Sequence, residues 1–306
     1  MKTLLYCMLS IYFFIVNTPT LIGEGKEPFS FTASDYYQKF VNSMQSENYK
    51  WAEYYGTTLL SAYPKSQFSK DIYFLLGKIY FTEKKLDLAN SFFSKYLQEE
   101  GIAKNLREVF AYKLQIAQQF EKGTKKAFFP SKLAPNWLSG REESLQICEE
   151  IIMSFPKDDL AAEALFCKSK NLLAKKKFQE SIQALEKLIE RFPKHSLALE
   201  AYIQIGRVYL LQTTKQFPDP DHLELAKINL KKMQYHFPQH PKIKDLVELV
   251  DKMESTFAER LFVVAQHYEN MNKPSSAAIY YETIIQEYPN TKHAKTSQYL
   301  INSRKK

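Results

Sequence analysis

Residues 257–291 read FAERLFVVAQHYENMNKPSSAAIYYETIIQEYPNT, and this stretch decides the fold. Ala265 and Tyr268 are three residues apart, so they share one face of a first helix. Residues 272–275 (NKPS) interrupt that helix, because proline lacks an amide hydrogen and disfavours a helical residue before it. The stretch therefore predicts a helix that ends at a sharp turn near residue 272.

A second helix follows the turn. We expect Ser275 or Ser276 to cap it, since a serine hydroxyl can accept a hydrogen bond from a free amide of the first turn. Its apolar stripe is made of Ala277, Tyr281 and Ile284. Tyr288-Pro289 ends it. The order of these features is that of a tetratricopeptide (TPR) unit, one helix-turn-helix hairpin per repeat.

The same ending recurs along the chain as an aromatic residue followed by proline. The five pairs are Tyr63-Pro64, Phe155-Pro156, Phe192-Pro193, Phe237-Pro238 and Tyr288-Pro289. From Pro156 to Pro193 the chain runs the length of one TPR unit, about 34 residues, plus a short linker. Gly101, another helix breaker, stands where a pair is expected after Pro64. The later spacings are longer, which indicates insertions.

Four positions inside the units also recur. If the closing residue is numbered 32, positions 8, 11, 20 and 24 are Gly77, Tyr80, Ala89 and Phe93 in the second unit; Ser169, Leu172, Ser181 and Leu185 in the fourth; Gly206, Tyr209, Ala226 and Leu230 in the fifth; and Ala265, Tyr268, Ala277 and Tyr281 in the last. The first unit keeps Ala52. We predict an all-α, TPR-like α-solenoid of five to six hairpins over residues 26–306, with residues 292–303 as a polar capping helix.

Two stretches interrupt the repeat. Residues 123–140 (GTKKAFFPSKLAPNWLSG) form a predicted loop insertion in the third unit. Its Phe128, Phe129 and Trp137 either mark a contact surface, as exposed aromatic residues on long loops often do, or fold back on the solenoid. Residues 243–270 contain no proline or glycine, so one long helix or two abutting helices precede the last turn.

The N-terminus has the features of an export signal. Leu4–Val16 (LLYCMLSIYFFIV) is apolar and uncharged. It is shorter than the about 20 residues that span a bilayer, and it suits the central part of a secretory signal. We predict a signal peptide over residues 1–25, cleaved after Gly23 or Gly25. The alternative is an uncleaved anchor. Cys7 lacks a small residue before it, so lipidation at Cys7 is not expected.

The charge balance excludes one class of partner. The formal net charge is +8, which favours acidic partners or anionic headgroups. The basic residues are spread along the chain, and the longest run is residues 175–177. This distribution argues against a dedicated nucleic-acid binder.

Two cysteines remain after the predicted signal, Cys148 and Cys167. Both lie in helical patterns, where a small buried thiol is the ordinary explanation. A disulfide between them in an oxidising compartment is left open, because it depends on a Cα separation that the sequence does not give.

The sequence nominates no catalytic, cofactor or metal site. It has no phosphate-binding glycine-rich loop, no G-x-S-x-G, no H-E-x-x-H and no paired C-x-x-C. His236 and His240 are four residues apart, but Pro238 breaks the helix that would align them for a metal. We therefore predict a non-enzymatic protein with no cofactor and no small-molecule substrate.

The predicted site is instead a surface for binding proteins. In a TPR solenoid the first helix of each hairpin lines the inner wall, and position 9 points from that wall. Position 9 is occupied by Lys78, Lys170, Arg207 and Gln266. Three cations on one wall can hold carboxylates of a partner. The alternative is an ordinary solvated face, since lysine and arginine are common on exposed helices.

The last unit resembles the BamD family, the outer-membrane β-barrel assembly lipoproteins of Gram-negative bacteria. The matching residues are Ala258-Glu259, Val264-Ala265, Tyr268, Ala277-Ala278 and Tyr288-Pro289-Asn290-Thr291. Residues 193–196 (PKHS) and the insertion at 217–220 (FPDP) are also similar to that family. The resemblance covers about residues 33–296. Tyr280 stands where the family usually has a basic residue.

The resemblance implies a scaffold at the periplasmic face of the outer membrane, in peripheral association with it. It would bind the barrel-forming subunit, other envelope proteins and nascent barrel substrates. The competing hypothesis is a periplasmic TPR adaptor of the Tol-Pal, cell-division or peptidoglycan machinery. Such adaptors often begin with a trimerising coiled coil, and residues 24–49 show no sustained heptads.

Overall fold

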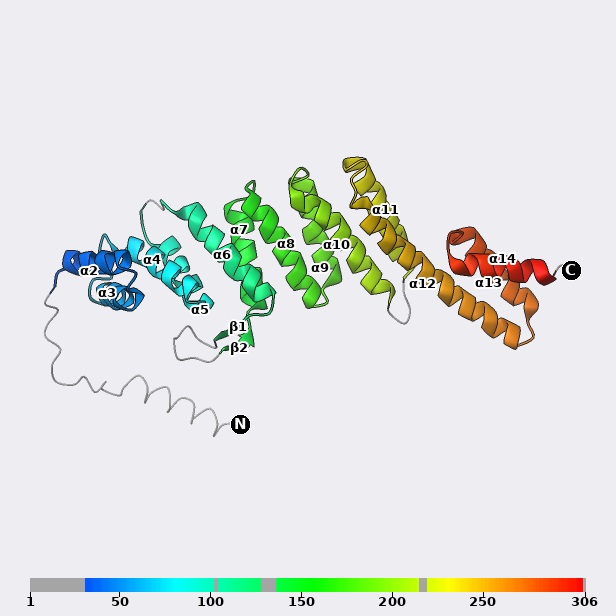
Figure 1. Cartoon of the computed structure of the whole chain (residues 1–306), viewed down its shortest axis with the longest axis horizontal. Coiled ribbons are helices and arrows are strands. Elements are labelled where there is room, and N and C mark those ends of the chain that lie inside the picture. Colours follow the sequence, from blue (N-terminus) through cyan, green and yellow to red (C-terminus); the bar gives the residue numbers. More distant parts are fainter. Residues whose placement is uncertain (1–30, 102–103, 128–135, 215–218, 305–306) are drawn as a thin grey trace, which may run out of the picture. The chain divides into compact units, whose positions relative to one another are not determined.

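A computed structural model describes residues 31–101, 104–127, 136–214 and 219–304 (Figure 1). The predicted signal peptide lies outside these residues, as do Phe128 and Phe129 of the predicted loop. The described residues form thirteen helices and one pair of short strands, which confirms the all-α, TPR-like prediction. None of these helices combines the length and the apolar character that crossing a bilayer requires.

The chain divides into two compact units, Met1–Lys104 and Asn105–Lys306. The described part of the first unit holds two helical hairpins. In the first hairpin α2 (Ala33–Gln45) packs on α3 (Tyr49–Ala62), and in the second α4 (Ser69–Thr82) packs on α5 (Leu86–Gln98).

The second unit holds four hairpins and a final helix. Its helices are α6 (Leu106–Glu121), α7 (Arg141–Ser154), α8 (Asp159–Ala174), α9 (Phe178–Arg191), α10 (Ser196–Thr213), α11 (Asp221–His236), α12 (Ile243–Asn270), α13 (Pro274–Glu287) and α14 (Lys292–Arg304). Helices α6 to α13 pair in sequence order, and α14 packs on both α12 and α13. The described residues thus contain the predicted number of hairpins and the predicted capping helix.

In the second and fourth units a small residue at position 8 lets the two helices of the hairpin approach closely. A Cβ added at Gly77 would lie 2.6 Å from Cε1 of Phe93, which occupies position 24 of the same unit. Ala89, at position 20, is fully buried. In the fourth unit the hydroxyl of Ser181 donates to the carbonyl of Ser169 over 2.8 Å, so two serines replace the glycine and alanine.

The third unit follows the same scheme, although its residues disguise it in the sequence. Its positions 8, 11, 20 and 24 are Ala117, Phe120, Ser144 and Cys148, and all four are buried. The Ser144 hydroxyl donates to the carbonyl of Ala117 over 2.7 Å. The contact between positions 8 and 20 is therefore kept despite the insertion between the two helices.

The turns inside four hairpins share a left-handed residue. These residues are Glu47, Lys84, Lys176 and Asn272, with φ between 53° and 60°. A single left-handed residue after a helix lets the chain reverse within a few positions. None of the four left-handed residues is glycine, so each turn carries the steric cost of a side chain in this conformation.

The start of α13 corrects one prediction. The helix begins at Pro274 with Lys273 at the N-cap, so neither Ser275 nor Ser276 caps it. Proline suits the first helical position, because the amide hydrogen that it lacks would have no partner there and its φ is already helical.

The structure describes both ends of the first interruption of the repeat and the whole of the second. The insertion begins and ends as an antiparallel pair, β1 (Lys125–Ala127) and β2 (Asn136–Ser139), with an irregularity between Lys126 and Ala127. The predicted loop is thus closed by strands. Residues 243–270 form the single helix α12, one of the two arrangements expected.

We predict that Gly77→Ala lowers the free energy of unfolding of the first unit by about 1–3 kcal/mol, the usual cost of overpacking a core. Alanine favours a helix over glycine by about 1 kcal/mol, but the added methyl meets the buried Phe93 ring. Urea unfolding followed by circular dichroism measures the change. In a Phe93→Leu background the cost should shrink, and stabilisation by Gly77→Ala in the wild-type background would contradict the packing described.

Candidate functional site

The first helices of the second unit form one continuous surface. Helices α6, α8, α10 and α12 pack on one another in that order (Figure 1). At position 8, Ser169, Gly206 and Ala265 are buried against neighbouring helices. The residue after each of them therefore points away from the hairpin. We call the surface made by these outward residues the first-helix wall.

The structure brings three of the four predicted binding residues onto this wall. Lys170 lies on α8, Arg207 on α10 and Gln266 on α12, and these three helices are neighbours. Lys170 is half-buried, whereas Arg207 and Gln266 are exposed. Lys78 occupies the equivalent place on α4, next to Gly77, but it belongs to the first unit.

Two of the lysines lie over an aromatic ring one helical turn earlier. The Lys170 ammonium is 4.9 Å from the centre of the Phe166 ring, and the Lys78 ammonium is 5.2 Å from that of Phe74. Cations in this position are attracted to the ring face. The two ammonium groups are thereby held in the same place in both units. Arg207 differs, since its guanidinium donates to Oε1 of Gln204 over 3.2 Å.

A cavity of about 420 Å³ opens beside Lys170, where α6, α8 and the start of α10 meet. Its lining includes Lys122 and Lys170 but also Glu121 and Glu163. The Gln118 amide donates to Oε2 of Glu163 over 3.2 Å. Both charge signs therefore surround the half-buried Phe166 ring. Such a lining suits a partner segment that carries a carboxylate, an amide or hydroxyl and an apolar side chain together.

The wall also exposes apolar side chains that the sequence reasoning missed. Leu211 on α10 is 49% exposed and Val263 on α12 is 59% exposed. Leu211 lies one turn after Arg207, and Val263 lies three residues before Gln266, so each shares the face of a predicted residue. The sequence did carry a signal for both residues: each is apolar and occupies a position of the repeat that lies outside the hydrophobic core.

Buried polar groups lie at the junction of α7 and α8. The Asn171 amide donates to Oγ of Ser144 over 2.8 Å, and Oγ of Ser144 lies 3.7 Å from the sulfur of Cys167. Cys148 and Cys167 are both buried and free, so the disulfide that the sequence left open is not formed. The Cys167 thiol and burial together raise the pKa of Cys148. A buried thiol of raised pKa is a packing residue rather than a nucleophile.

The two histidines four residues apart lie in different segments. His236 is the last residue of α11, while Nδ1 of His240 accepts from the amide of Lys242 in the following turn. Within the described residues no three His, Cys, Asp or Glu side chains gather as metal ligands would.

Tyr280 takes part in an aromatic pair at the last hairpin. It lies on α13, and its ring stacks on Tyr268 of α12 with centroids 5.4 Å apart. A hydrogen bond with Tyr268 raises the pKa of Tyr280. Tyr280 and Tyr268 therefore form an uncharged aromatic pair between α12 and α13.

An ion pair links the two helices that flank the cavity. Asp158 caps α8, because its Oδ1 accepts from the amide of Leu160 over 2.9 Å. Both Asp158 oxygens also accept from the guanidinium of Arg107 on α6, over 3.1 and 3.2 Å. The Arg107 hydrogen bond, followed by that from Leu160, holds the pKa of Asp158 below its ordinary value.

Comparison with known families gives one match. The model of the family YfiO, described as outer membrane lipoprotein, matches residues 147–306. The matched range begins within α7 and includes α8, α10 and α12 of the first-helix wall. No curated protein matches the chain.

Several solved TPR structures are similar to the chain in their helical repeats. A TPR protein from Parabacteroides merdae is 13% identical, with 88% of this chain and 97% of that chain covered and a TM-score of 0.38. The C-terminal part of a TPR protein from Cytophaga hutchinsonii is 15% identical, with 87% of both chains covered and a TM-score of 0.40. PilF of Pseudomonas aeruginosa is 14% identical, with 87% and 96% covered and a TM-score of 0.34. Similarity at this level says nothing of function.

We predict that Asp158→Ala lowers the free energy of unfolding of the second unit at pH 7 by about 1 kcal/mol, the usual worth of an N-cap. Because the folded-state pKa of Asp158 is depressed, its contribution is present above the unfolded pKa of about 3.9 and is lost as pH falls through the folded pKa. Urea unfolding at a series of pH values measures this. Asp158→Asn, which keeps a capping oxygen, should cost less. An equal cost of Asp158→Ala at all pH values would rule out the charged interaction.

Proposed function

The chain belongs to the YfiO, or BamD, family of outer membrane lipoproteins, and from this we propose that it is a scaffold of the machinery that assembles β-barrel proteins in the outer membrane. The observation that carries the proposal is the range of the family match. It includes three of the four helices of the first-helix wall, where a partner can lie across successive hairpins. Stacked helical repeats bind partners along such extended surfaces.

We propose that the wall holds a segment of the barrel-forming subunit, or of a barrel substrate. The Phe166 ring offers an apolar seat, Lys170 and Arg207 offer cations, and Leu211 and Val263 extend the apolar part. Gln266 contributes an amide at the far helix. Glu121 and Glu163 also line the cavity beside Lys170. Because their carboxylates would repel a second carboxylate of the partner, the bound segment should carry no more than one carboxylate at this place.

The proposed role is one of binding rather than catalysis. The charged groups beside the cavity surround an aromatic ring with both signs of charge. That arrangement suits recognition of a chain segment. It is not the pairing of a nucleophile with an oriented base that a reaction needs. Lys78 of the first unit, with its own phenylalanine, would offer an equivalent contact to the same or another partner.

The proposed location is the periplasmic face of the outer membrane, in peripheral association with the bilayer. It is supported by the family description, outer membrane lipoprotein. The role is tested by affinity capture from detergent-solubilised envelopes. Recovery of the large barrel-forming subunit supports the proposal, whereas recovery of Pal or TolA without it would favour the Tol-Pal adaptor instead.

We predict that Lys170→Glu combined with Arg207→Glu weakens partner binding by roughly tenfold at low salt, because two charge-assisted contacts are reversed. The loss should shrink as salt is added, since exposed charges are screened. The dissociation constant for the purified barrel-forming subunit is measured at several ionic strengths.

The matched control is Lys187→Glu combined with Lys232→Glu. These exposed lysines lie on α9 and α11, the second helices of the same two hairpins, so the change of net charge is identical. Equal losses of affinity for the two double variants would mean that net charge alone explains the effect. An unchanged affinity of the Lys170 and Arg207 variant at low ionic strength would remove the wall from the binding site.

A further inference from the structure

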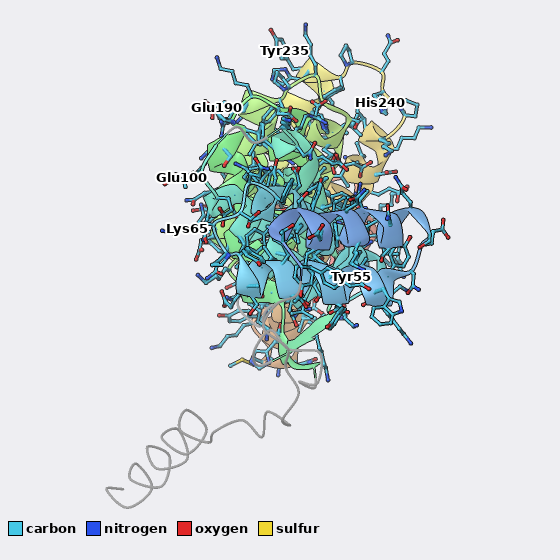
Figure 2. All side chains as sticks on the ribbon, turned by 90° about the vertical axis from the view of Figure 1, so that its left-hand side faces the viewer. Tyr55, Lys65, Glu100, Glu190, Tyr235 and His240 are labelled. Carbon is cyan, nitrogen blue, oxygen red and sulfur yellow. The ribbon has the colours of Figure 1, made fainter. Side chains whose placement is uncertain are left out.

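Aromatic side chains gather on the outer surface of the first hairpin. Trp51 is 52% exposed and Tyr54 is 55% exposed, and Phe31 and Tyr49 are also exposed. Together with Tyr55, which is labelled on the blue α3 ribbon in Figure 2, they form what we call the aromatic patch. These rings lie at the start of the described chain, on α3 and on the residue that precedes the α2 cap.

Four of the five rings of the patch are linked by contacts, and Tyr49 adds an exposed ring two residues before Trp51. The rings of Trp51, Tyr54 and Tyr55 contact one another with centroids 5.4 to 5.7 Å apart. The ammonium of Lys39 on α2 lies 4.4 Å from the centre of the Phe31 ring and 5.6 Å from that of Tyr55. One cation therefore ties the residue before α2 to the rings on α3. Trp51 and Tyr54 protrude, because about half of each side chain is exposed, so they fit a surface better than they line a groove.

Several polar groups of α3 are hydrogen-bonded within the first unit, in part to α4 of the second hairpin. Glu53, its one carboxylate, is buried and accepts from the hydroxyl of Tyr80 over 2.5 Å. Thr57 and Thr58 donate back to the carbonyls of Glu53 and Tyr54 over 2.7 Å. The charged group that α3 turns to solvent is then Lys50. The exposed charge of α3 itself is therefore positive, while the turn before it carries the exposed carboxylate of Glu47.

We propose that the aromatic patch rests in the headgroup region of a phospholipid bilayer. Tryptophan and tyrosine rings favour the boundary between hydrocarbon and water, because each joins a large apolar body to one polar atom. Lysines such as Lys39 and Lys50 extend their apolar stems while their charges remain among the headgroups. A protein partner would cover the same rings, but the positive and protruding face of α3 fits a lipid surface better.

The position of the patch in the chain supports this occupant. The apolar run Leu4–Val16 ends 15 residues before Phe31. Fifteen residues span at most about 50 Å. If that run is retained as the uncleaved anchor, the alternative to the predicted cleaved signal peptide, the patch is kept within this reach of the bilayer. The inference rests on the membrane location in the proposed function, but it requires none of the proposed protein partners.

Trp51 itself reports the contact. The chain has two tryptophans, so the full-length Trp137→Phe variant leaves Trp51 as the only one. Vesicles of phosphatidylethanolamine and phosphatidylglycerol, three to one, are prepared with and without brominated acyl chains. We expect the Trp51 emission to shift to shorter wavelength when vesicles are added and to lose intensity when the acyl chains carry bromine. Sedimentation with the vesicles measures binding separately.

Two further variants in the same background make the test specific. Tyr49→Ser with Tyr54→Ser removes two rings of the patch and should reduce the quenching. Tyr235→Ser removes the more exposed ring on α11, also labelled in Figure 2, and should leave it unchanged. Circular dichroism checks that each variant is folded.

Three results would overturn the proposal. Vesicle-bound chains in which Trp51 is neither shifted nor quenched would place the patch away from lipid. Equal effects of Tyr235→Ser and the patch variant would make the contact non-specific. Shielding of Trp51 by the purified barrel-forming subunit, and not by vesicles, would make the patch a protein contact. The vesicle experiment contains no partner, so its failure leaves the scaffold function standing, and failed capture of the partner leaves the lipid contact standing.

Discussion

Close approach of neighbouring helices, within the second, third and fourth hairpins and between α10 and α12 at Gly206, is the constraint on which the rest of the structure depends. Gly77 admits the ring of Phe93, while the hydroxyls of Ser144 and Ser181 reach across to carbonyls of the facing helix. Glycine removes a side chain from the crossing, whereas serine adds a hydrogen bond to it, and both keep the helix axes near. Once that spacing is fixed, the next residue along the first helix must face outward. The chemistry of the first-helix wall, including Lys170, follows from it.

Much of the repeat organisation could be predicted from the sequence, because proline, glycine and alanine each occur at particular positions of a helical hairpin. The third unit was predicted, but its core positions were not assigned, because Ser144 takes the place of a small apolar residue and an insertion hides the spacing. Lys176 gave no sign of a left-handed turn, since lysine has no preference for one. The start of α13 at Pro274 was misread as a break followed by a serine cap. The positions of the wall residues were predictable, and the four-residue spacing of Phe166 and Lys170 was a readable signal. The carboxylates around Lys170 come from different helices, and only packing brings them together.

The two candidate contact surfaces use aromatic rings in opposite ways. On the first-helix wall, Phe166 lies beneath a cation and is half-buried, so it forms the floor of a mixed-charge cavity. On the aromatic patch, Trp51 and Tyr54 project from a helix whose carboxylate, Glu53, is drawn inward by Tyr80. The first arrangement selects a chain segment by its sequence of groups. The aromatic patch offers a large apolar area but few groups that could distinguish one partner sequence from another. This suits a lipid surface, which has no fixed pattern of groups.

The short range of the hairpin contacts has a consequence for how the chain acquires its structure. The hydrogen bond from Ser181 to Ser169 joins residues 12 apart, and that from Ser144 to Ala117 joins residues 27 apart. Contacts this local keep the entropy of loop closure small, and proteins rich in them fold fast. Each hairpin can close as soon as its own two helices are free, before the C-terminal residues are available. A chain that emerges gradually, from a ribosome or a translocation pore, would thus add one hairpin at a time, and each new hairpin would cover the apolar face that the one before it leaves exposed.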